Sequence, residues 1–407
     1  MSMLYELADE KVWEAFLQYK TERQHLSERE REALEEFVRG KRYSRVTDRL
    51  VEGNYVFEPP VKISINKSGT RKKRIVYSFS EEESMVLKIM SYLLYRYDDR
   101  ISSRCFSFRR NSCAKDAIVQ ILKIKNLEKK YCLKADISNY FNSIPSEKLI
   151  AVLQGIVTDD EPLLQFLIRL LSDGRACAEG ELISEERGAM AGIPIAPFFA
   201  NIYLLSMDEE FERCGIDYFR YSDDILIFAD SKEQLEEVKA LLYTRIAEKR
   251  LTINSDKVSI SKPGHPWEFL GFCYRDGKID LSRVTKDKMK AKIRRKAHAL
   301  YRRRVRRGVE FDYSAKTLLR IFNKKYFDES DERRFTWSRW FFPVLTTDEG
   351  LKELDAYLIQ YVRYLYSGRH YKGNYKVTYE DIKALGFRSL VHEYYEWKEE
   401  RFSISDY

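Results

Sequence analysis

Residues 218–229 read YFRYSDDILIFA, and this stretch decides the fold. Two apolar runs flank Ser222, Asp223 and Asp224, which predicts a β-hairpin with two acids at its tip. A second apolar strand, YCLKADI, brings Asp136 to its end. Three carboxylates brought together repel one another unless a divalent metal neutralises them, and Mg²⁺ prefers such oxygen ligands. The alternative is an ordinary polar turn, because Asp-Asp pairs are common in turns.

The sequence around this hairpin alternates β-rich segments with helical ones up to about residue 280. A β-rich hairpin is expected at 55–79, with a basic tip around the turn residues Ser68 and Gly69. A further hairpin-like pair is expected within 251–279. From residue 284 onward the pattern is helical. The helices expected before that point cover residues 1–50, 81–98, 114–126, 146–171 and 232–249. Residues 188–215 are expected to form a loop punctuated by Gly and Pro that runs into a further helix.

The charge is unevenly distributed along the chain. The whole sequence carries a net charge of +8, yet residues 283–307 alone hold thirteen Lys and Arg against one Asp. That block contributes +12, which leaves about −4 for the rest of the chain. A basic block on a mildly acidic protein suggests a polyanion as partner, with nucleic acid the first candidate. The alternative is a solvated helix face without a partner.

Several classes of protein are disfavoured by composition. Hydrophobic residues make up 44% of the 407 residues, which is enough for a packed core and argues against a disordered chain. No apolar run approaches the ~20 residues of a membrane helix. The first residues carry acids where a signal peptide has its apolar stretch. Six widely spaced cysteines without a C-x-x-C pair suggest reduced thiols. We therefore expect a cytoplasmic protein that does not contact a membrane.

Seven motifs occur in a fixed order between about Val61 and Tyr274, and together they resemble those of a bacterial-type reverse transcriptase. This family includes group II intron, retron and defence-associated enzymes. The resemblance implies an α+β right-hand polymerase fold with an antiparallel palm sheet and a helical thumb. The motifs are RKKRIVYSF (71–79), CFSFRRNSCAKDAI (105–118), LKADISNYFNSIP (133–145), GAMAGIPIAPFFANIYL (188–204), YSDD (221–224), LTINSDKVSI (251–260) and EFLGF (268–272).

The resemblance also implies a division of the chain into three parts. Residues 1–54 would form a helical N-terminal extension. Residues 55–280 would form the fingers and palm, the reverse transcriptase core. Residues 281–407 would form a basic, helical thumb and a C-terminal extension.

In this family, the acids of the palm motifs bind two metal ions. The resemblance assigns that role to Asp136, Asp223 and Asp224, with the carbonyl of Ile137 as a further ligand. The expected ions are two Mg²⁺, with Mn²⁺ as an alternative. Lys257 matches the lysine proposed to protonate the pyrophosphate leaving group. A surface lysine beside a strand is the alternative for Lys257.

The resemblance implies dNTP contacts from the fingers and from two palm motifs. Phe141 takes the place of an aromatic gate against a ribose 2′-hydroxyl, which predicts selection of dNTPs over NTPs. Ala191 stands where the family usually has Gln, and Ala196 where Ser is common, so ordinary templated copying is in doubt. The expected dNTP-binding residues are Lys72, Arg74, Phe141, Ala191 and Gly192.

Other residues are expected to hold the nucleic acid. EFLGF resembles the primer grip, which assigns the primer end to Phe269, Leu270 and Gly271. The basic helix of the thumb would lie along the template–primer backbone, where phosphate contacts give affinity without sequence information. Arg109 is a weaker candidate for a template contact. The expected nucleic-acid-binding residues are Arg109, Lys292, Arg294, Arg295, Arg302, Arg303 and Arg304.

Within the family, the chain most resembles the unknown-group enzymes, many of which act in antiphage defence. The chain shows neither an H-N-H nuclease nor the N-A-x-x-H insertion typical of retron enzymes. The predicted function is RNA-directed DNA synthesis from dNTPs on a dedicated non-coding RNA, with RNA template and DNA product as partners. A partner protein or a homo-oligomer is possible. The alternatives are an untemplated or protein-primed DNA polymerase, an RNA polymerase on a palm fold, and a catalytically silent RNA-binding scaffold.

Overall fold

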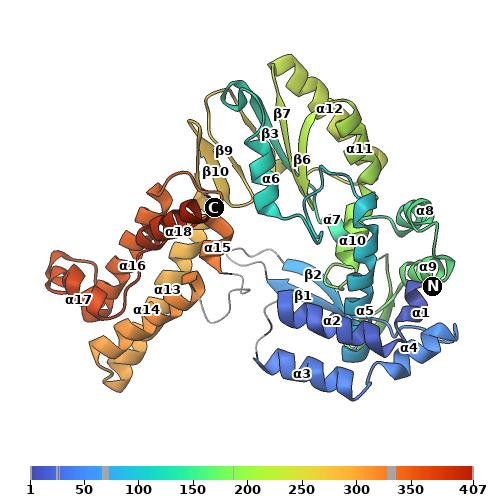
Figure 1. The fold of residues 1–407 in the computed structure, drawn as a ribbon, viewed down its shortest axis with the longest axis horizontal. Coiled ribbons are helices and arrows are strands. Elements are labelled where there is room, and N and C mark those ends of the chain that lie inside the picture. The colour runs from blue at the N-terminus through green and yellow to red at the C-terminus, as the bar shows by residue number, and fades with distance from the viewer. Residues whose placement is uncertain are drawn as a thin grey trace. The chain divides into compact units, whose positions relative to one another are not determined.

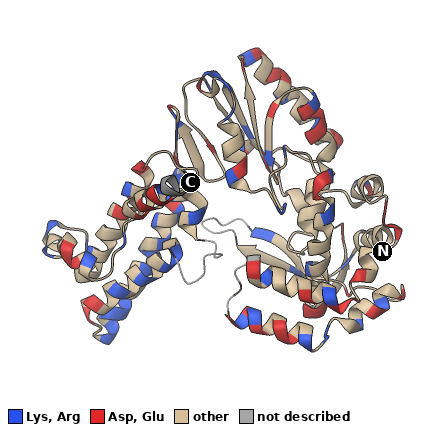
Figure 2. Cartoon of the chain, in the orientation of Figure 1, with Lys and Arg blue, Asp and Glu red and all other residues tan. Residues whose placement is uncertain are grey.

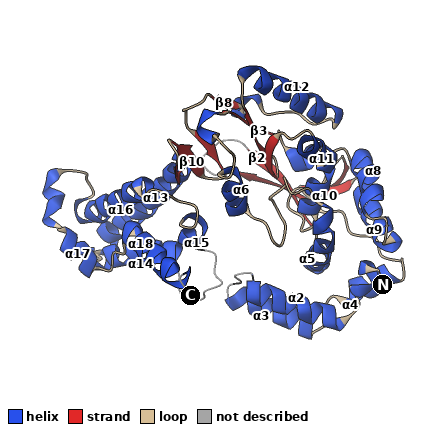
Figure 3. Ribbon diagram, turned by 45° about the horizontal axis from the view of Figure 1, so that its top comes forward, coloured by secondary structure: helices blue, strands red, loops and turns tan. Residues whose placement is uncertain are grey.

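The computed structural model describes residues 2–23, 26, 28–66, 73–186, 188–327 and 336–405. The chain divides into two compact units, Met1–Lys262 and Pro263–Tyr407. Figure 1 shows the elements of both units, and Figure 3 distinguishes their helices from their strands. Within the described ranges, no helix combines the length and the apolar character that a membrane crossing requires.

The centre of the first unit is a four-stranded antiparallel sheet, which we call the palm sheet. Its spatial order is β6-β7-β3-β8. The helices α11 and α12 pack against it, and Figure 1 shows α12 running alongside its strands. The elements are β3 (Tyr131–Asp136), β6 (Asp217–Tyr221), β7 (Asp224–Ala229), β8 (Ser259–Ser261), α11 (Leu205–Arg213) and α12 (Lys232–Glu248), with the short 3₁₀ helix η3 (Ser255–Lys257) before β8.

A second four-stranded sheet contains the hairpin expected at 55–79. Its order is β2-β1-β4-β5, and β1 pairs with β2 in an antiparallel register that sets Val61 opposite Ser78. The expected turn at Ser68 and Gly69 lies outside the described residues. The hairpin β4–β5 was not predicted. The strands are β1 (Val61–Asn66), β2 (Lys73–Ser78), β4 (Arg175–Ala178) and β5 (Glu181–Ser184).

Helices at the start of the chain pack onto the core of the first unit. Ser80 and Glu83 form a capping box that starts α5, and Trp13 of α2 is fully buried and stacks on Tyr43 at 4.1 Å. Asp160 accepts hydrogen bonds from the hydroxyl of Ser2 and the backbone N–H of Met3. The Ser2 bond measures 2.5 Å. The helices are α1 (Met3–Glu6), α2 (Glu10–Arg23), α3 (Glu28–Arg39), α4 (Ser44–Val51) and α5 (Glu81–Leu94), which continues into η1 (Tyr95–Arg100).

Two expected helices are shorter or divided in the structure. The helix expected at 114–126 ends at Ile121, and Asn126 takes a left-handed conformation before a short 3₁₀ helix that leads to β3. The stretch 146–171 forms two helices because Asp160 caps a new helix that has Pro162 in its first turn. The remaining elements of the first unit are α6 (Ala114–Ile121), η2 (Leu127–Lys129), α7 (Tyr140–Ser143), α8 (Ser146–Ile156), α9 (Glu161–Ser172) and α10 (Ala196–Tyr203).

The second unit begins with a three-stranded antiparallel sheet and continues as helices. The long helix α13 packs against α14 and α16. The sheet belongs to this unit, whereas the sequence placed it before a boundary at residue 280. The elements are β9 (Trp267–Phe269), β10 (Phe272–Arg275), β11 (Lys278–Leu281), α13 (Arg283–Arg307), α14 (Phe311–Phe327), α15 (Trp337–Phe341), α16 (Glu349–Ser367), η4 (Lys372–Lys376), α17 (Tyr379–Ala384) and α18 (Leu390–Ser405).

Candidate active site

The register of the palm sheet brings the predicted acids together at one end of it. The strands β3 and β7 are antiparallel, and Asp136 lies directly opposite Asp224. Asp223 occupies the turn between β6 and β7. The backbone N–H of Ile137 donates to the carbonyl of Asp223 at 3.1 Å, which ties this turn to the end of β3. The three acids therefore come from two neighbouring strands and the turn that joins one of them to β6.

These carboxylates act on one another electrostatically. Asp136 is buried, with 4% of its surface exposed. Burial raises the pKa of Asp224 to about 6. Lys134 opposes this shift, and the charges of Asp223 and Asp136 add to it. Burial and the charge of Asp136 also raise the pKa of Asp223, against the effect of Lys257 and Arg74. Such a site favours any group that brings positive charge.

Lys257 supplies one positive charge at this site. Its ammonium Nζ lies 2.5 Å from Oδ2 of Asp136, and the amide of Asn254 is 3.4 Å from Oδ1 of the same carboxylate. Burial lowers the pKa of Lys257, but the hydrogen bond to Asp136 and the three nearby carboxylates outweigh it and raise the pKa. About half of the Lys257 side chain is exposed, so it can be reached from solvent. The lysine thus holds its proton beside Asp136.

Lys134 is a further cation that the sequence analysis missed. It lies two residues before Asp136 on β3, so the two side chains point to the same face of the sheet. After burial, the charge of Lys134 has the largest effect on the pKa of Asp224, which it lowers. The spacing Lys134-x-Asp136 within an apolar strand was the pattern that could have identified it.

The donor chemistry of the site suits a hard divalent cation. Carboxylate oxygens are the ligands that Mg²⁺ prefers. Among the side chains that the structure describes, no group of three or more His, Cys, Asp or Glu is arranged to hold a metal ion. The carboxylate of Asp136 is instead paired with Lys257. Asp136, Asp223 and Asp224 therefore supply suitable oxygen ligands and an excess of negative charge. Their side chains are not arranged as a complete coordination shell.

A loop containing Gly188 and Gly192 packs between α7 and β2. A Cβ atom added at Gly188 would lie 2.6 Å from the carbonyl oxygen of Phe141, and one added at Gly192 would lie 2.9 Å from that of Tyr77. Both glycines have a positive φ. The loop can pass this close to α7 and β2 only because these positions carry no side chain.

Asn142, next to Phe141, fastens this loop. Its side-chain amide donates to the carbonyl of Ile75 at 3.0 Å and accepts from the backbone N–H of Ala191 at 2.8 Å. The carbonyl of Ala191 accepts in turn from Tyr77 of β2. Ala191 is buried and acts through its backbone, at the position where the resemblance led us to expect a Gln.

A fully buried ion pair lies beneath the acidic turn. Arg220 of β6 and Asp208 of α11 are both inaccessible to solvent, and the guanidinium makes two hydrogen bonds to the carboxylate. The same guanidinium donates to the carbonyl of Ser222 at 3.3 Å and to that of Asn201 at 3.1 Å. Tyr218 donates to Asp208 at 2.7 Å. The pair thus holds one side of the turn that carries Asp223.

The other side of the turn is held by Ser107 and Asn201. The backbone N–H of Ser222 donates to the Ser107 hydroxyl at 2.9 Å, and that hydroxyl donates to the side chain of Asn201 at 3.0 Å. Ser222 has a φ of +60°, an unusual conformation for a residue with a side chain. Bonds to both its N–H and its carbonyl stabilise it there. The sequence analysis did not identify Arg220, Asp208, Ser107 or Asn201.

The remaining predicted residues of the first unit lie in different surroundings. Arg74 is exposed on β2, close enough for its charge to act on Asp223. Phe141 is half-buried, and its ring packs edge-on against Phe108 with centroids 6.3 Å apart. Lys72 lies outside the described residues. Arg109 donates to the backbone carbonyls of Asp98, Ser102 and Cys105, so its guanidinium is engaged within the protein.

The expected primer grip forms a tight turn in the second unit. Leu270 and Gly271 have φ values of 51° and 92° and connect β9 to β10, while Phe269 is fully buried. The carbonyl of Gly271 accepts from Ser282 and from the hydroxyl of Thr285, at the start of α13. The turn is therefore fixed to the beginning of the basic helix.

Figure 2 shows Lys and Arg along α13. Five of the predicted residues are exposed on it, namely Lys292, Arg294, Arg295, Arg302 and Arg303. Arg304 differs from these five, because it donates to the carbonyls of Leu365 and Tyr366 at 3.1 and 3.0 Å. Arg304 thus satisfies the last carbonyls of α16, which a helix end leaves without partners.

Comparison with known proteins gives a family match over the same region. Residues 65–274 match the family model described as reverse transcriptase (RNA-dependent DNA polymerase). The retron Ec86 reverse transcriptase of Escherichia coli is 24% identical over 56% of this chain and 68% of its own length. The retron Ec83 reverse transcriptase of Escherichia coli is 29% identical over 38% of this chain. That match covers 52% of the relative's own length.

Solved structures of telomerase are also similar to the chain. One from Candida tropicalis has a TM-score of 0.43 and 12% identity, with 60% of each chain covered. One from Candida albicans, in complex with a fragment of telomeric RNA, has a TM-score of 0.46 and 13% identity. This match covers 89% of this chain and 70% of the telomerase.

Proposed function

We propose, on the premise that the chain belongs to the reverse transcriptase family, that it copies a dedicated non-coding RNA into DNA and acts in antiphage defence. The family match covers about half of the chain, and it confirms the predicted enzyme class, an RNA-directed DNA polymerase. The predicted α+β right-hand fold is confirmed as well, with the antiparallel palm sheet at its centre. The observation that supports catalysis most directly is the pairing of Asp136 with Asp224 beside Asp223.

The metal ligands in this proposal are Asp136, Asp223 and Asp224, with the carbonyl of Ile137. Two Mg²⁺ ions bound there would activate the primer 3′-hydroxyl and stabilise the leaving pyrophosphate. The protein contributes the position of the ligands: the strand register aligns two of them, and the buried pair Arg220–Asp208 holds the turn of the third. Mn²⁺ is the alternative ion, because it also prefers carboxylate and carbonyl oxygens as ligands.

The proposed dNTP site lies between β2, α7 and the loop around Gly192. Arg74 and Lys72 supply positive charge for the triphosphate, and Phe141 blocks a ribose 2′-hydroxyl. Ala191 and Gly192 position the loop through their backbone, as the bonds to Asn142 and Tyr77 indicate. Lys257 holds the proton that the leaving pyrophosphate would receive.

The proposed nucleic-acid contacts are in the second unit. The turn formed by Phe269, Leu270 and Gly271 would hold the primer end. The exposed basic residues of α13 would bind phosphates of template and product. Arg109 is engaged with three backbone carbonyls, so we assign it to positioning the segment around Ser107 and not to nucleic acid.

The proposed RNA and the defence role rest on the resemblance to retron and unknown-group enzymes. The relatives that support it are two retron reverse transcriptases, which are 24% and 29% identical to this chain over 240 and 168 residues. Untemplated or protein-primed synthesis is the second candidate. One observation favours it: position 191 holds a buried Ala, so it offers the incoming nucleotide no polar side chain.

The first experiment measures incorporation of labelled dNTPs by the full chain with its co-purified RNA and Mg²⁺. The double variant Asp223→Asn/Asp224→Asn should lose more than about a hundredfold in rate, since its side chains no longer offer charged ligands. The control is Asp230→Asn, an exposed acid at the far end of β7, which should retain activity. Equal rates for the wild type and the double variant would contradict the proposal.

The second experiment separates templated from untemplated synthesis. Each dNTP is omitted in turn, and both the product and the co-purified RNA are sequenced. A product complementary to part of one RNA supports the proposal, and a product without a complement supports the second candidate. Phage plaque counts on cells expressing the wild type or the double variant test the defence role. Equal counts on both would contradict that role.

A further inference from the structure

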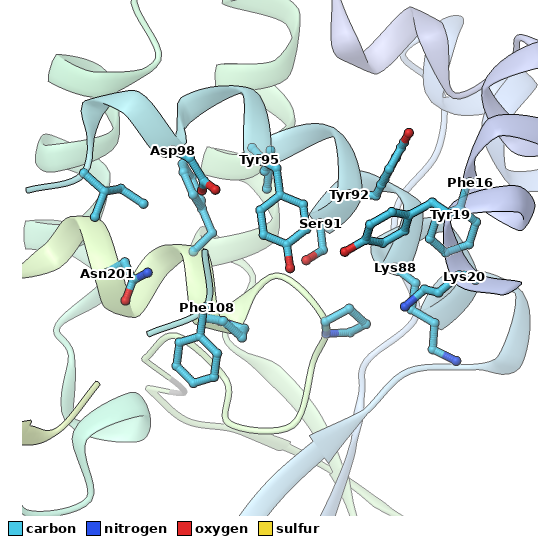
Figure 4. Close-up of a pocket in the computed structure, with 15 residues that line it drawn as sticks. Phe16, Tyr19, Lys20, Lys88, Ser91, Tyr92, Tyr95, Asp98, Phe108 and Asn201 are labelled. Carbon is cyan, nitrogen blue, oxygen red and sulfur yellow. The ribbon is translucent and has the colours of Figure 1, made fainter. Parts of the chain in front are cut away.

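A cavity of about 320 Å³ lies in the first unit, apart from the acidic site. Its walls come from α2, from α5 with η1, and from the start of α10. Figure 4 shows its lining residues, with lysines near one end and Phe108 at the other. Asp136, Asp223 and Asp224 do not line it. Its volume is at the lower end of the range found for small-ligand sites.

Two lysines from different helices gather at one end of this cavity. Lys20 extends from α2 and Lys88 from α5, and Figure 4 shows their side chains close to each other. Burial and the charge of Lys88 lower the pKa of Lys20 to about 8. Glu30 and Glu81 line a neighbouring cavity together with the same two lysines. The two ammonium groups supply the point charges with which lysine binds phosphate.

Tyrosine rings form the wall beside the lysines. The rings of Tyr19 and Tyr92 lie 4.9 Å apart, and the guanidinium of Arg110 covers Tyr19, Tyr92 and Tyr95 at 5.5, 4.7 and 5.2 Å. Burial and a hydrogen bond with Tyr19 help to raise the pKa of Tyr95 to about 12. These rings are therefore held in place, and they offer aromatic surface within reach of two cations.

Phe108 connects the cavity with the proposed dNTP site. It lines the cavity and contacts Phe141, and 40% of its surface is exposed. Its φ of +55° is rarely adopted by a bulky residue. The ring therefore projects at the boundary between the cavity and Phe141.

We propose that this cavity binds a nucleoside phosphate, with the phosphate between Lys20 and Lys88 and the base against the tyrosine rings. Lysine binds phosphate as a point charge. Aromatic rings can stack on any of the bases, because every base has a flat π-face. The nucleotide is either free or part of a single strand, since both present the same groups. The site is separate from the metal ligands, so it goes beyond the proposed polymerase function and does not depend on it.

The test measures binding of two probes to the full chain without dNTPs, so that it does not depend on catalysis. The probes are 1,N6-ethenoadenosine monophosphate for a free nucleotide and a fluorescent, 5′-phosphorylated oligothymidylate for a strand. The variant Lys20→Met/Lys88→Met should weaken binding of at least one probe by tenfold or more. The control Lys11→Met removes an exposed lysine from the same helix and should change the Kd less than twofold.

If the double variant loses binding of only one of the two probes, the proposal is supported. The probe that is lost then shows whether the site takes a free nucleotide or a single strand. Unchanged binding of both probes in the double variant, or no binding of either by the wild type, would overturn it. Photolabelling of the wild-type protein with 8-azido-AMP does not depend on how a variant folds. Label on peptides containing Tyr19 or Tyr92 is expected, and label confined to other peptides would also overturn the proposal.

The pH dependence of binding gives an independent check. Raising the pH through 8 removes the proton of Lys20, so phosphate binding by the wild type should weaken between pH 7 and 9.5. Lys20→Arg keeps its charge and should bind equally over this range. The other charged or titratable groups that line a cavity with Lys20 are Lys88, Glu30, Glu81, Asp98 and the tyrosines, and Arg110 lies over the ring of Tyr19; all are the same in both proteins. Identical pH profiles for the two proteins would contradict the role of Lys20.

Discussion

At the scale of single residues, the candidate site depends on side chains that never reach the substrate. The guanidinium of Arg220 connects Asp208 of α11 to the carbonyl of Ser222, next to Asp223. A buried charge costs several kcal/mol unless a partner and further hydrogen bonds compensate it, and here four hydrogen bonds to three acceptor groups do so. The position of the acidic turn is therefore coupled to the stability of the fold.

Removing Asp208 should accordingly destabilise the protein. Asp208→Ala leaves Arg220 charged and unpaired in a site without solvent, so the free energy of unfolding should fall by about 3–5 kcal/mol. Urea denaturation followed by circular dichroism measures this change. The comparison is Glu147→Ala, which breaks an ion pair exposed on both sides and should leave stability unchanged. Equal stability of the two variants would contradict the role given to the buried pair.

The sequence could indicate the acids but not the residues that hold them. Asp136 and Asp224 stand at the ends of apolar strands, but this pattern left an ordinary polar turn open. The order of the seven motifs and the resemblance that they carry assigned the acids to one site. Arg220 is a charged residue within an apolar strand and Asp208 lies on a charged helix, and residues of these types are mostly exposed in proteins. Only the packing of α11 against β6 shows that they are buried together. The catalytic roles themselves stay predictions.

At the scale of elements, the loop around Gly192 links α7 to β2. It is held by backbone hydrogen bonds and by the side chain of Asn142, and its glycines allow close approach. The sequence indicated a loop leading into a helix here, because Gly and Pro punctuate it. It did not indicate the hairpin β4–β5, whose short strands carry no clear alternation and are joined only by the turn at Glu179 and Gly180.

Gly192→Ala should disturb this loop and the proposed dNTP site with it. The new Cβ would lie 2.9 Å from the backbone of β2, and the φ of +107° adds strain. We expect a loss of about 1–3 kcal/mol in stability and a raised KM for dNTPs. Gly155→Ala in α8 is the control, because its Cβ meets nothing within 4 Å, and Ala is the better helix former there. If Gly192→Ala has the same KM for dNTPs as the wild type, the loop does not contribute to dNTP binding.

At the scale of the whole molecule, the two main features are the uneven distribution of charge and the division of the chain into two compact units. The basic block predicted from sequence is one continuous helix, α13, in a unit that begins at Pro263. The sequence placed a boundary at residue 280, since the pattern changes from strands to helix there. The sheet β9–β11 nevertheless belongs with the helices, because the turn at Gly271 bonds to the start of α13. Contacts between distant residues, which no local pattern reports, decide such a boundary.

The salt dependence of RNA binding tests α13 as a phosphate-binding surface. Each phosphate contact contributes about 0.7 to the slope of log K against log salt for a single strand. Arg302→Ala/Arg303→Ala should therefore reduce the slope by about 1.4, measured by fluorescence anisotropy on a single-stranded RNA. Arg304→Ala should mainly lower the melting temperature, since Arg304 bonds to the end of α16. An unchanged slope in the double variant would mean that Arg302 and Arg303 do not contact RNA phosphates.

The buried pair Arg220–Asp208 also constrains how this sequence can evolve. A mutation at either position leaves an isolated charge in the interior, so neither change is tolerated before the other. Replacement of both together by apolar residues of similar volume avoids that cost. Across related genes, the two positions should therefore covary: either both charges are present or neither is.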